Sequence, residues 1–336
     1  MADRGYFHPV ILKDRIIPGN IFLAPLAGFS DRAFRHICIS HGASFTYTEM
    51  VSCEGILRNN EKTTLLTAPA DNEHLYGIQL FTSVPDSAAR AVEKASKFNP
   101  TLFDLNCGCP VPKVVRSGAG AALLKEPEKI GKIIRSMYNA TDHPITVKIR
   151  SGWDAESINY DETAAAAVEN GAVMVTLHAR TRTQGYSGTA NRDHIEDLQK
   201  KTFVPVFASG DIYSPQAAAE VMAVTGCAGV IFARGALGNP FVFQQTQDYF
   251  KTGSYQQPDV PQKLHAALEH LEYARHYLGE ARACKEMKKH LCSYTKGIPG
   301  GATLRNKIVH VEEYEEYREI FMIFFGNGDG GKKDIK

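Results

Sequence analysis

Short apolar runs bounded by turn residues alternate with amphipathic stretches along the first 240 residues of the chain. The runs expected to form strands are residues 21–26, 44–48, 75–81, 102–106, 144–149, 172–177, 204–208 and 228–233. Between them, apolar residues at helical spacing predict helices at residues 86–98, 128–139, 161–170 and 214–225. Regular alternation of strand and helix predicts an α/β fold with a parallel sheet.

The number and spacing of these units favour a closed barrel. Eight strand–helix units within roughly 235 residues fit a (β/α)8 TIM barrel, which usually takes about 250 residues. An open doubly wound sheet is the alternative, but no Gly-x-Gly-x-x-Gly segment follows the first predicted strand.

Beyond residue 240 the strand pattern stops and long helical patterns begin, with Pro258 and Pro261 near the change. We therefore expect two domains, a barrel at residues 1–243 and a smaller all-α helical domain at residues 244–325. The acidic stretch 312–319 predicts a terminal helix that faces water, and residues 326–336 are predicted to be a disordered tail.

The composition is that of an ordinary soluble protein, with 43% hydrophobic residues, 22% charged residues and a formal net charge of +1. The total charge gives no sign of a polyanionic partner, so any nucleic-acid surface must be local. The chain shows no basic stretch followed by an apolar one at its start, and no apolar run long enough to span a bilayer. Seven scattered cysteines fit reduced thiols better than a disulfide framework, so we expect a cytoplasmic protein.

The barrel prediction can be tested against the candidate functional residues, because active sites of this fold lie in the loops at the carboxyl ends of the strands. Polar, small or reactive residues lie at or near the end of each predicted strand. In chain order they are Pro25, Leu26 and Ala27, Glu49, Gln79, Asn106 and Cys109, Lys148 and Arg150, His178 and Arg180, Ser209, Gly210 and Asp211, and Ala233 and Arg234. We expect these residues to converge on one mouth.

Cys109 is the most informative of these residues, since Gly108 and Pro110 force a turn around a thiol at the end of an apolar strand. Most cysteines are packing residues. The cysteines that we interpret in this way are Cys38, Cys227 and Cys292. A metal site at Cys107 and Cys109 is disfavoured, because one intervening residue is not the usual ligand spacing and no second cysteine pair follows. We expect chemistry at Cys109 and no metal.

Small residues after the last two strands suggest an anion site, since phosphate sites in this fold often lie there. Ser209, Gly210 and Asp211 let backbone N–H groups approach an anion, and Ala233 with Arg234 adds a charge partner. Each segment alone is equally well explained as a tight turn, but on adjacent strands they favour a phosphate-bearing cofactor.

Two other residues keep several interpretations. Lys148 at a strand end suits a Schiff-base lysine, an anion partner or a solvated side chain, and its neighbours do not separate these roles. His178 alone is more often a hydrogen-bonded structural histidine than a catalytic one.

The predicted helical domain carries a local positive charge. Residues 263–309 contain nine Lys or Arg and four Glu, with Tyr273, Tyr277 and Tyr294 between them. By charge alone, a solvated bundle face explains this pattern better than a nucleic-acid surface.

The motifs together resemble the tRNA-dihydrouridine synthase family, in its bacterial branch. The matching segments are residues 24–28 with Asp31, 49–50, Gln79, 106–113, 148–150, 178–182 and 210–212, and in the later part 289–290, Tyr294, 296–297, 299–300 and 304–305. The resemblance covers residues 23–311 and implies flavoenzymes that use reduced FMN, with NADPH or NADH as reductant, to saturate the C5=C6 bond of uracil in tRNA. It also favours tRNA binding by the helical domain over the solvated-face interpretation.

The resemblance assigns roles residue by residue. It implies that Pro25, Leu26 and Ala27 line the flavin ring, that Gln79 and Lys148 hydrogen-bond its polar edge, and that His178 contacts it. Ser209, Gly210 and Asp211, with Ala233 and Arg234, are implied to hold the ribityl chain and phosphate. Asn106 is implied to orient the uracil, Arg192 to make a second contact, and Cys109 to be the catalytic acid.

This chemistry needs a protonated thiol, so we expect the Cys109 pKa to lie near or above the free value of about 8.5. A stacked uracil cannot reach a recessed mouth, so the base must be flipped out or presented by a distorted loop. Arg150, Arg180 and Arg182 are candidates to guide the phosphate backbone. The chain departs from the family at Ser209, where asparagine is frequent, at Ala233, where glycine is common, and at Leu26, where methionine is commoner.

Two other functions remain as alternatives. An FMN barrel that reduces a free pyrimidine such as dihydroorotate shares the fold and cofactor, but does not need a basic helical domain. A non-enzymatic RNA-binding module predicts no bound flavin. We expect a monomer with tRNA as partner, without a membrane or an obligate protein partner.

Overall fold

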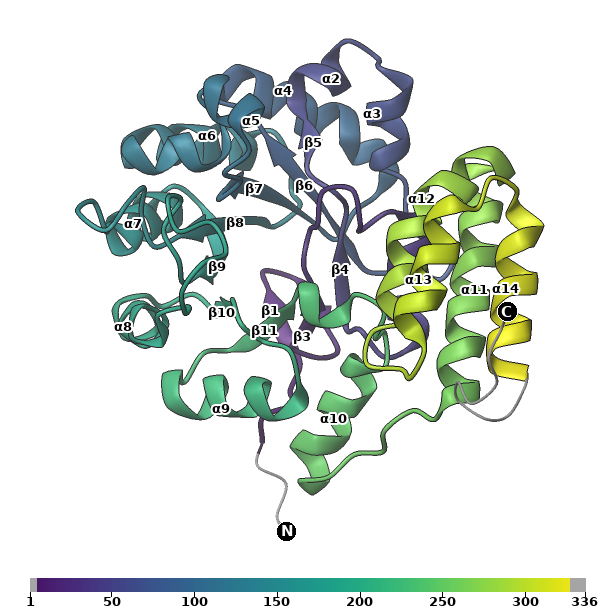
Figure 1. Ribbon diagram of the computed structural model, residues 1–336. Coiled ribbons are helices and arrows are strands. Elements are labelled where there is room, and N and C mark those ends of the chain that lie inside the picture. The colour runs from purple at the N-terminus through teal and green to yellow at the C-terminus, as the bar shows by residue number, and fades with distance from the viewer. Residues whose placement is uncertain (1–4, 327–336) are drawn as a thin grey trace.

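The computed structural model describes residues 5–326 and has a closed parallel barrel at its centre (Figure 1). The barrel strands are β3 (Ile21–Leu23), β4 (Phe45–Tyr47), β6 (Tyr76–Phe81), β7 (Leu102–Cys107), β8 (Ile145–Arg150), β9 (Ala172–His178), β10 (Val206–Ser209) and β11 (Gly229–Phe232). Neighbours pair in parallel from β4 through β3, β11, β10, β9, β8 and β7 to β6, and pairing of β4 with β6 closes the ring. The predicted eight-stranded TIM barrel is therefore confirmed.

Helices surround the barrel and cover the outer faces of its strands (Figure 1). They are α1 (Arg32–Ser40), α4 (Pro85–Ala95), α6 (Pro127–Asn139), α7 (Tyr160–Glu169), α8 (Arg192–Lys201), α9 (Pro215–Thr225) and α10 (Val242–Thr252). Local sequence fixes their ends. In α9, for example, the Ser214 side chain caps the first turn, Pro215 opens the helix and Gly226 ends it at φ 65°.

A short antiparallel hairpin of β1 (Val10–Leu12) and β2 (Arg15–Ile17) lies before the barrel in the chain. Its inward residues Val10, Leu12 and Ile17 are buried in one cluster with Phe22 and Phe207 of the barrel strands. The hairpin therefore packs against the barrel interior, and none of its residues lines the cavity at the carboxyl ends of the strands.

Further short elements interrupt two of the loops at the carboxyl ends of the strands. They are β5 (Val51–Ser52), α2 (Cys53–Leu57) and α3 (Glu61–Leu66) after β4, and α5 (Pro112–Arg116) after β7. The hydrophobic pattern did not predict these elements or the hairpin.

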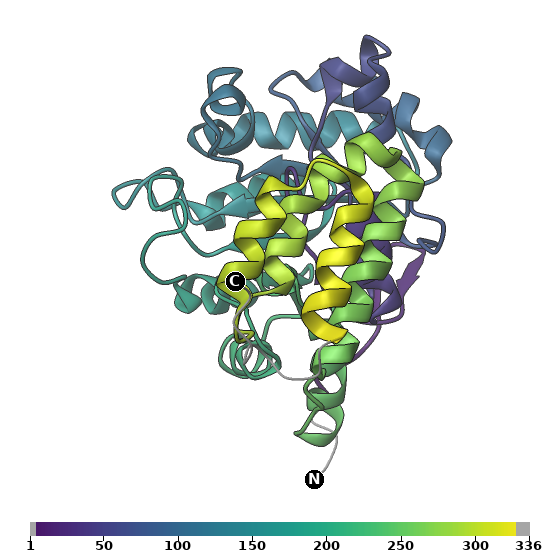
Figure 2. The same ribbon diagram turned by 45° about the vertical axis from the view of Figure 1, so that its right-hand side comes forward.

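The carboxy-terminal part is a layer of four helices beside the barrel (Figure 2). These are α11 (Val260–Leu278), α12 (Glu280–Tyr294), α13 (Gly301–His310) and α14 (Tyr314–Gly326). Asp259 and Gln262 form a reciprocal capping box that starts α11. The layer has its own apolar cluster, which includes Met287 and Leu291 and extends to Ala33 of α1. The predicted helical region after the barrel is thus confirmed.

Two details differ from the expectations. The acidic terminal helix does not simply face water, since Tyr317 and Phe321 of α14 are fully buried in the helical cluster. The expected domain boundary at residue 244 falls inside α10, whose Phe243 and Phe250 belong to the barrel core. The packing therefore groups α10 with the barrel.

Of the predicted tail, residues 327–336 lie outside the described residues, and Gly326 ends α14. Across the described helices, none has the length and apolarity needed to cross a membrane.

Candidate active site

A cavity of about 480 Å³ opens at the carboxyl ends of the barrel strands. Its walls contain most of the residues singled out from the sequence. These are Pro25, Leu26, Ala27, Gln79, Asn106, Cys109, Lys148, Arg150, His178, Ser209, Gly210, Asp211, Ala233 and Arg234. Wall residues that the sequence did not single out include Phe29, Tyr186 and Tyr213. Arg182 and Arg192 do not line this cavity.

One wall carries a chain of hydrogen bonds between the side chains of β6 and β7. Gln79 Nε2 donates to Asp104 Oδ2 at 2.7 Å, and Asn106 Nδ2 donates to Gln79 Oε1 at 2.8 Å. Asn106 Oδ1 in turn accepts the backbone N–H of Cys109 at 2.9 Å. Strand register explains the contact, because Gln79 lies directly opposite Asp104. Asp104, which is 1% exposed, was not predicted, although it precedes Asn106 by two residues and so shares its face of β7.

Lys148 is the cation on the neighbouring strand. It pairs in register with Asn106 across β7 and β8, and it lines the cavity. Burial lowers the pKa of Lys148 to about 8; the charge of Arg150 lowers it further, and Asp104 raises it. The structure removes the solvated interpretation of Lys148, because its side chain belongs to the cavity wall.

Cys109 lies in the turn after β7, with a partly buried side chain. Burial raises the pKa of its thiol above the ordinary value. The turn is closed by Ala121, whose N–H donates to the Cys109 carbonyl at 3.0 Å. Among residues 5–326, no group of three or more His, Cys, Asp or Glu side chains is arranged to hold a metal ion. Because its pKa is raised, the Cys109 thiol is protonated and uncharged at neutral pH.

The loop after β10 brings the backbone close to His178. Gly210 has φ 113°, and a Cβ there would lie 3.0 Å from His178 Cδ2 and 2.9 Å from Ala190 Cβ. Asp211 follows with φ 54°. Its carboxylate accepts from Arg180 at 2.7 Å and from the Ala190 N–H at 2.8 Å, so the Asp211 side chain is engaged within the protein. Only glycine fits such a close backbone approach without displacing its neighbours.

His178 ends β9 and is 9% exposed. Burial lowers its pKa to about 2, with Lys148 and Arg150 acting in the same direction, so the ring is neutral at physiological pH. The Nε2 atom is buried and has no hydrogen-bond partner within the protein. A buried polar atom in a cavity wall marks a place for a ligand group.

Two of the arginines expected to guide RNA bind groups within the protein. Arg150 is 3% exposed and donates to the carbonyls of Gly108, Thr181 and Gly185 at 2.8, 3.0 and 2.9 Å. Arg180 is 2% exposed and binds Asp211. These guanidinium groups hold rim loops together, and Arg150 also lines the cavity, so their contact with a phosphate backbone stays a prediction.

The two remaining arginines lie outside the cavity. Arg182 stacks over the ring of Trp153 with its guanidinium carbon 4.5 Å from the ring centroid. Arg192 opens α8 and pairs with Glu220 at 2.7 Å. A uracil contact by Arg192 would require this ion pair to open.

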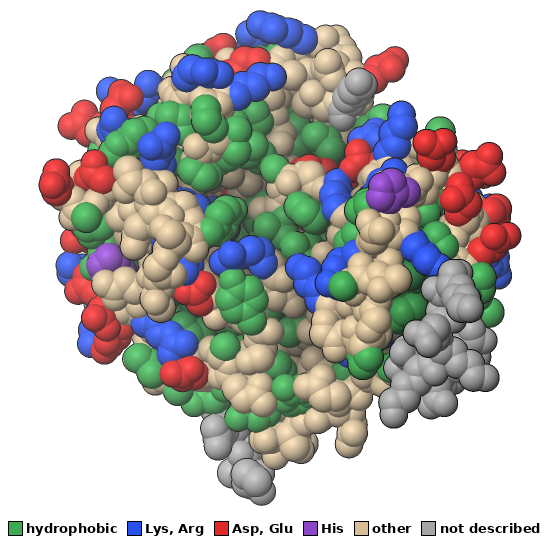
Figure 3. All heavy atoms as spheres, in the orientation of Figure 1, with side chains coloured by type: hydrophobic (Ala, Val, Ile, Leu, Met, Phe, Trp, Pro, Cys, Tyr) green, Lys and Arg blue, Asp and Glu red, His purple; other side chains and the backbone are tan. Residues whose placement is uncertain are grey.

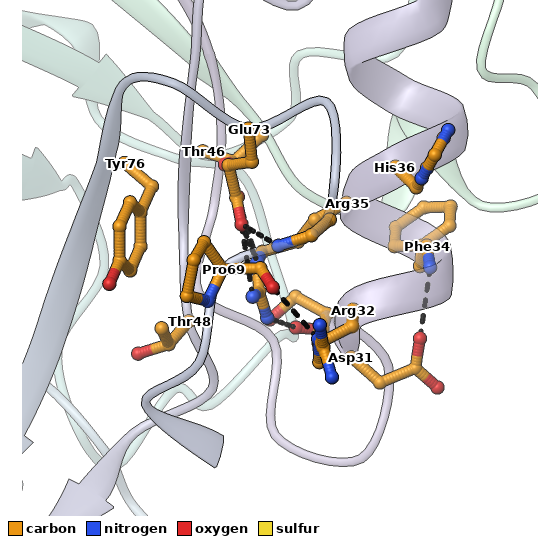
Figure 4. Close-up of polar contacts among 12 residues, drawn as sticks. Asp31, Arg32, Phe34, Arg35, His36, Thr46, Thr48, Pro69, Glu73 and Tyr76 are labelled. Atoms are coloured by element: carbon orange, nitrogen blue, oxygen red, sulfur yellow. Dashed lines mark hydrogen bonds and ion pairs between the residues drawn. The ribbon is translucent and has the colours of Figure 1, made fainter. Parts of the chain in front are cut away.

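Hydrogen bonds of Ser30 and of Arg35 in α1 hold the loop that contains Pro25, Leu26 and Ala27. Leu26 donates its N–H to Ser30 Oγ at 2.8 Å. Arg35 of α1 donates to the Ser30 carbonyl at 3.0 Å and to Glu73 at 2.8 Å. Figure 4 shows Arg35 and Glu73 facing each other beside Thr46. This buried ion pair fixes the loop that forms one side of the cavity.

The helical layer reaches the cavity through Phe29, which lines it. Lys289 of α12 lies over the Phe29 ring at 5.3 Å, and His290 meets its edge at 5.4 Å. Nearby, the backbone of Ser293 approaches Gly238 so closely that a Cβ on Gly238 would overlap it. The layer therefore borders the mouth of the cavity.

The surface charge is unevenly distributed over the helical layer. In Figure 3, Lys and Arg side chains lie around the hollow and on the part of the layer nearest the barrel, whereas Asp and Glu side chains gather at its outer edge. The mouth is thus bordered by positive charge from both parts of the chain.

Residues 22–324 match the family model described as dihydrouridine synthase (Dus). The chain belongs to the dihydrouridine synthase family. A probable tRNA-dihydrouridine synthase of Treponema pallidum is 41% identical over 333 residues, which are 95% of this chain and 97% of that protein. tRNA-dihydrouridine synthase B of Pasteurella multocida is 31% identical over 301 residues, 89% of this chain and 91% of that protein. The family predicted from the sequence motifs is confirmed.

Solved structures similar to this family member share the fold at low identity. Histamine dehydrogenase from Rhizobium sp. 4-9 superposes with a TM-score of 0.57 at 12% identity, covering 80% of this chain. The superposition spans 51% of the histamine dehydrogenase chain, so this chain corresponds to about half of that protein.

Proposed function

We propose that the protein is a tRNA-dihydrouridine synthase that reduces the C5=C6 bond of uridine in tRNA with FMN and NADPH or NADH. The observation that carries the proposal is that Cys109, Asn106, Lys148 and His178 share the walls of one cavity in a member of the dihydrouridine synthase family. We assign flavin binding to the barrel and tRNA binding to the helical layer.

The cavity fits a flavin nucleotide. Gly210 lets the β10 loop lie against His178 in the cavity wall, and His178 Nε2 is a buried polar atom without a protein partner. Arg234 is 40% exposed at the rim, with its guanidinium 3.8 Å from Asp211, and provides the charge for a phosphate. Because the Asp211 carboxylate is engaged by Arg180, we assign the backbone of Asp211, not its side chain, to the phosphate.

A bound reduced flavin would supply the hydride that adds to carbon 6 of uracil. The protein supplies the proton: the Cys109 S–H bond breaks, the proton adds to carbon 5, and the resulting thiolate regains a proton from water. Burial of Cys109 favours this role, because it raises the thiol pKa and keeps the acid protonated at neutral pH. Asn106 and Gln79 present fixed amides to the two ring systems.

The helical layer explains how a tRNA base reaches the cavity. Positive side chains border the mouth, and a uridine must leave its stack to enter it. We place the protein in the cytoplasm as a monomer, where unmodified tRNA is its substrate. Arg182 and Arg192 remain proposed substrate contacts at the outer side of the β9 loop.

The test is mass spectrometry of dihydrouridine in unmodified tRNA incubated with flavin-loaded protein and NADPH. We expect product from the wild type and a loss of about 10²–10⁴-fold in Cys109→Ala with unchanged flavin content. Cys292→Ala, a partly buried cysteine of α12, is the matched control and keeps activity. No product on any tRNA, although NADPH reduces the bound flavin, would refute the proposal and favour a free pyrimidine as substrate.

A further inference from the structure

We propose that Asp104 is a positioning residue: it fixes the orientation of the Gln79 and Asn106 amides and supplies the negative charge that offsets Lys148. The inference deepens the proposed function and rests on it, in that the cavity is taken to hold flavin and uracil. Asp104 itself does not line the cavity, so it acts through its neighbours.

The hydrogen bonds give the amide chain one direction. A carboxylate only accepts, so the amide nitrogen of Gln79 must face Asp104 at 2.7 Å. At the other end, backbone N–H groups only donate, so the amide oxygen of Asn106 must face Gly108 and Cys109 at 3.2 and 2.9 Å. The two ends agree, because the Asn106 nitrogen is then left to donate to the Gln79 oxygen at 2.8 Å.

This direction decides what the amides present to a ligand. Each amide nitrogen carries two hydrogens. Gln79 uses one of them toward Asp104, whereas Asn106 uses one toward Gln79 and directs the other to Met50 Sδ at 4.0 Å, a weak acceptor in the cavity wall. Gln79 therefore keeps one N–H as a donor for a carbonyl oxygen on a flavin edge, and Asn106 offers its second N–H to a uracil carbonyl in exchange for the weak contact with Met50. Without the carboxylate, Gln79 could rotate and present its oxygen instead.

The charge of Asp104 is held in place from several strands. Thr146 on β8 donates to Asp104 Oδ1 at 2.6 Å. Tyr47 of β4, Cys107 of β7 and Lys148 of β8 also interact with the carboxylate. Burial raises the Asp104 pKa to about 6, while the bonds from Thr146 and Gln79 hold it down, so the group is ionised at neutral pH.

Lys148 depends on that charge. Arg150 of its own strand opposes its protonation, His178 of β9 is neutral, and Asp104 of β7 favours protonation. Because the charge of Asp104 favours the protonated form of Lys148, removing it should move the Lys148 pKa downward from about 8.

The experiment compares the wild type with Asp104→Asn and with Glu73→Gln. Asparagine at position 104 keeps the shape and one acceptor for Gln79, removes the charge, and turns the group that faces the Thr146 hydroxyl into a donor. Glu73→Gln is the matched control, since it also turns a buried barrel carboxylate into an amide but belongs to the Arg35 network. The first measurement follows the Lys148 titration by NMR of lysine labelled with ¹³C at Cε, without tRNA or reductant. The second is the pH profile of dihydrouridine formation.

We expect the Lys148 midpoint and the alkaline limb of the pH profile to fall together by about 1 unit in Asp104→Asn. Glu73→Gln lowers stability and moves neither. An unchanged Lys148 midpoint in a folded Asp104→Asn protein would overturn the inference, as would equal loss of rate at every pH. If the wild type forms no dihydrouridine, the proposed function fails, and the NMR titration still decides the role of Asp104. Should Asp104→Asn not fold, Thr146→Val is the second variant. It removes the hydrogen bond that lowers the Asp104 pKa, so the acid limb of the pH profile of dihydrouridine formation must move to higher pH.

Discussion

The buried ion pair between Arg35 and Glu73 offers a quantitative test of how the cavity wall is held. The side chains are 1% and 0% exposed and bond at 2.8 Å. Glu73 also accepts from the Thr46 hydroxyl and, at 2.8 Å, from the Ala70 N–H. Glu73→Gln removes the charge, keeps the shape and leaves the guanidinium in the core without its counterion.

The cost follows from the burial of both groups. Removing one partner of a buried pair costs about 3–5 kcal/mol, because the remaining charge stays out of water. Glutamine keeps one acceptor for Arg35, so we expect the lower end, about 3 kcal/mol. For 336 residues, an unfolding entropy of roughly 0.7 kcal/mol/K converts this into a fall in Tm of about 4 °C.

The assay is thermal unfolding of the flavin-free protein followed by circular dichroism, together with flavin content after reconstitution. Glu220→Gln is the control, since its ion pair with Arg192 lies at the surface, and we expect its Tm to stay within about 1 °C of the wild type. Flavin content should also fall in Glu73→Gln, because Arg35 holds the Ser30 carbonyl behind the cavity wall. Equal Tm values for the two variants would refute the reasoning.

Two further predictions concern the cavity itself. Gly210→Ala should reduce bound flavin several-fold without preventing folding, because the added Cβ would meet His178 at 3.0 Å and φ 113° strains any residue other than glycine. Absorbance at 450 nm per protein measures the bound flavin. A flavin content equal to that of the wild type would contradict flavin binding beside the β10 loop. Cys109 should react with iodoacetamide more slowly than glutathione at pH 7.5 and faster as the pH rises, because burial raises its pKa and only the thiolate reacts. Peptide mass spectrometry measures this rate, and fast labelling at pH 6–7 would show an activated thiolate instead.

The barrel was predictable because each of its strands is buried on both faces. In β7 all six residues from Leu102 to Cys107 are buried, and four of them are apolar, whereas Asp104 and Asn106 are the polar exceptions. The ends of the runs were less well defined. The first prediction continued to residue 26, whereas β3 ends at Leu23, and Pro25 lacks the N–H that a longer ladder would use.

The β1–β2 hairpin was missed because its strands have only three residues each. The signal was present in the apolar triplet at residues 10–12 and the pair Ile16 and Ile17, with Lys13 at φ 56° in the turn between them. A search for runs long enough to cross a barrel passes over such a pair. Its role, closing one end of the barrel, depends on tertiary packing that no local pattern records.

The positions of the site residues were predictable from the fold, since parallel strands bring their carboxyl ends to one face. The partners of the polar side chains were not. Asp211 is engaged by Arg180, and Arg192 by Glu220. A sequence shows which charged residues lie in a loop. It does not show whether such a residue is already paired with an opposite charge in the folded protein.

Three buried arginines show why this difference matters at the mouth. Arg35, Arg150 and Arg180 are 1%, 3% and 2% exposed. Arg35 donates to the carbonyls of Ser30 and Ala68. Arg150 donates to those of Gly108, Thr181 and Gly185, and Arg180 donates to those of Ser187 and Gly188. Loops without a ladder need such donors, because buried carbonyls without partners are costly. The shape of the cavity is therefore set by buried cations, of which Arg150 also lines the cavity. Replacing Arg35 or Arg180 would alter flavin and tRNA binding together through the rim, whereas a true RNA contact would change tRNA binding alone.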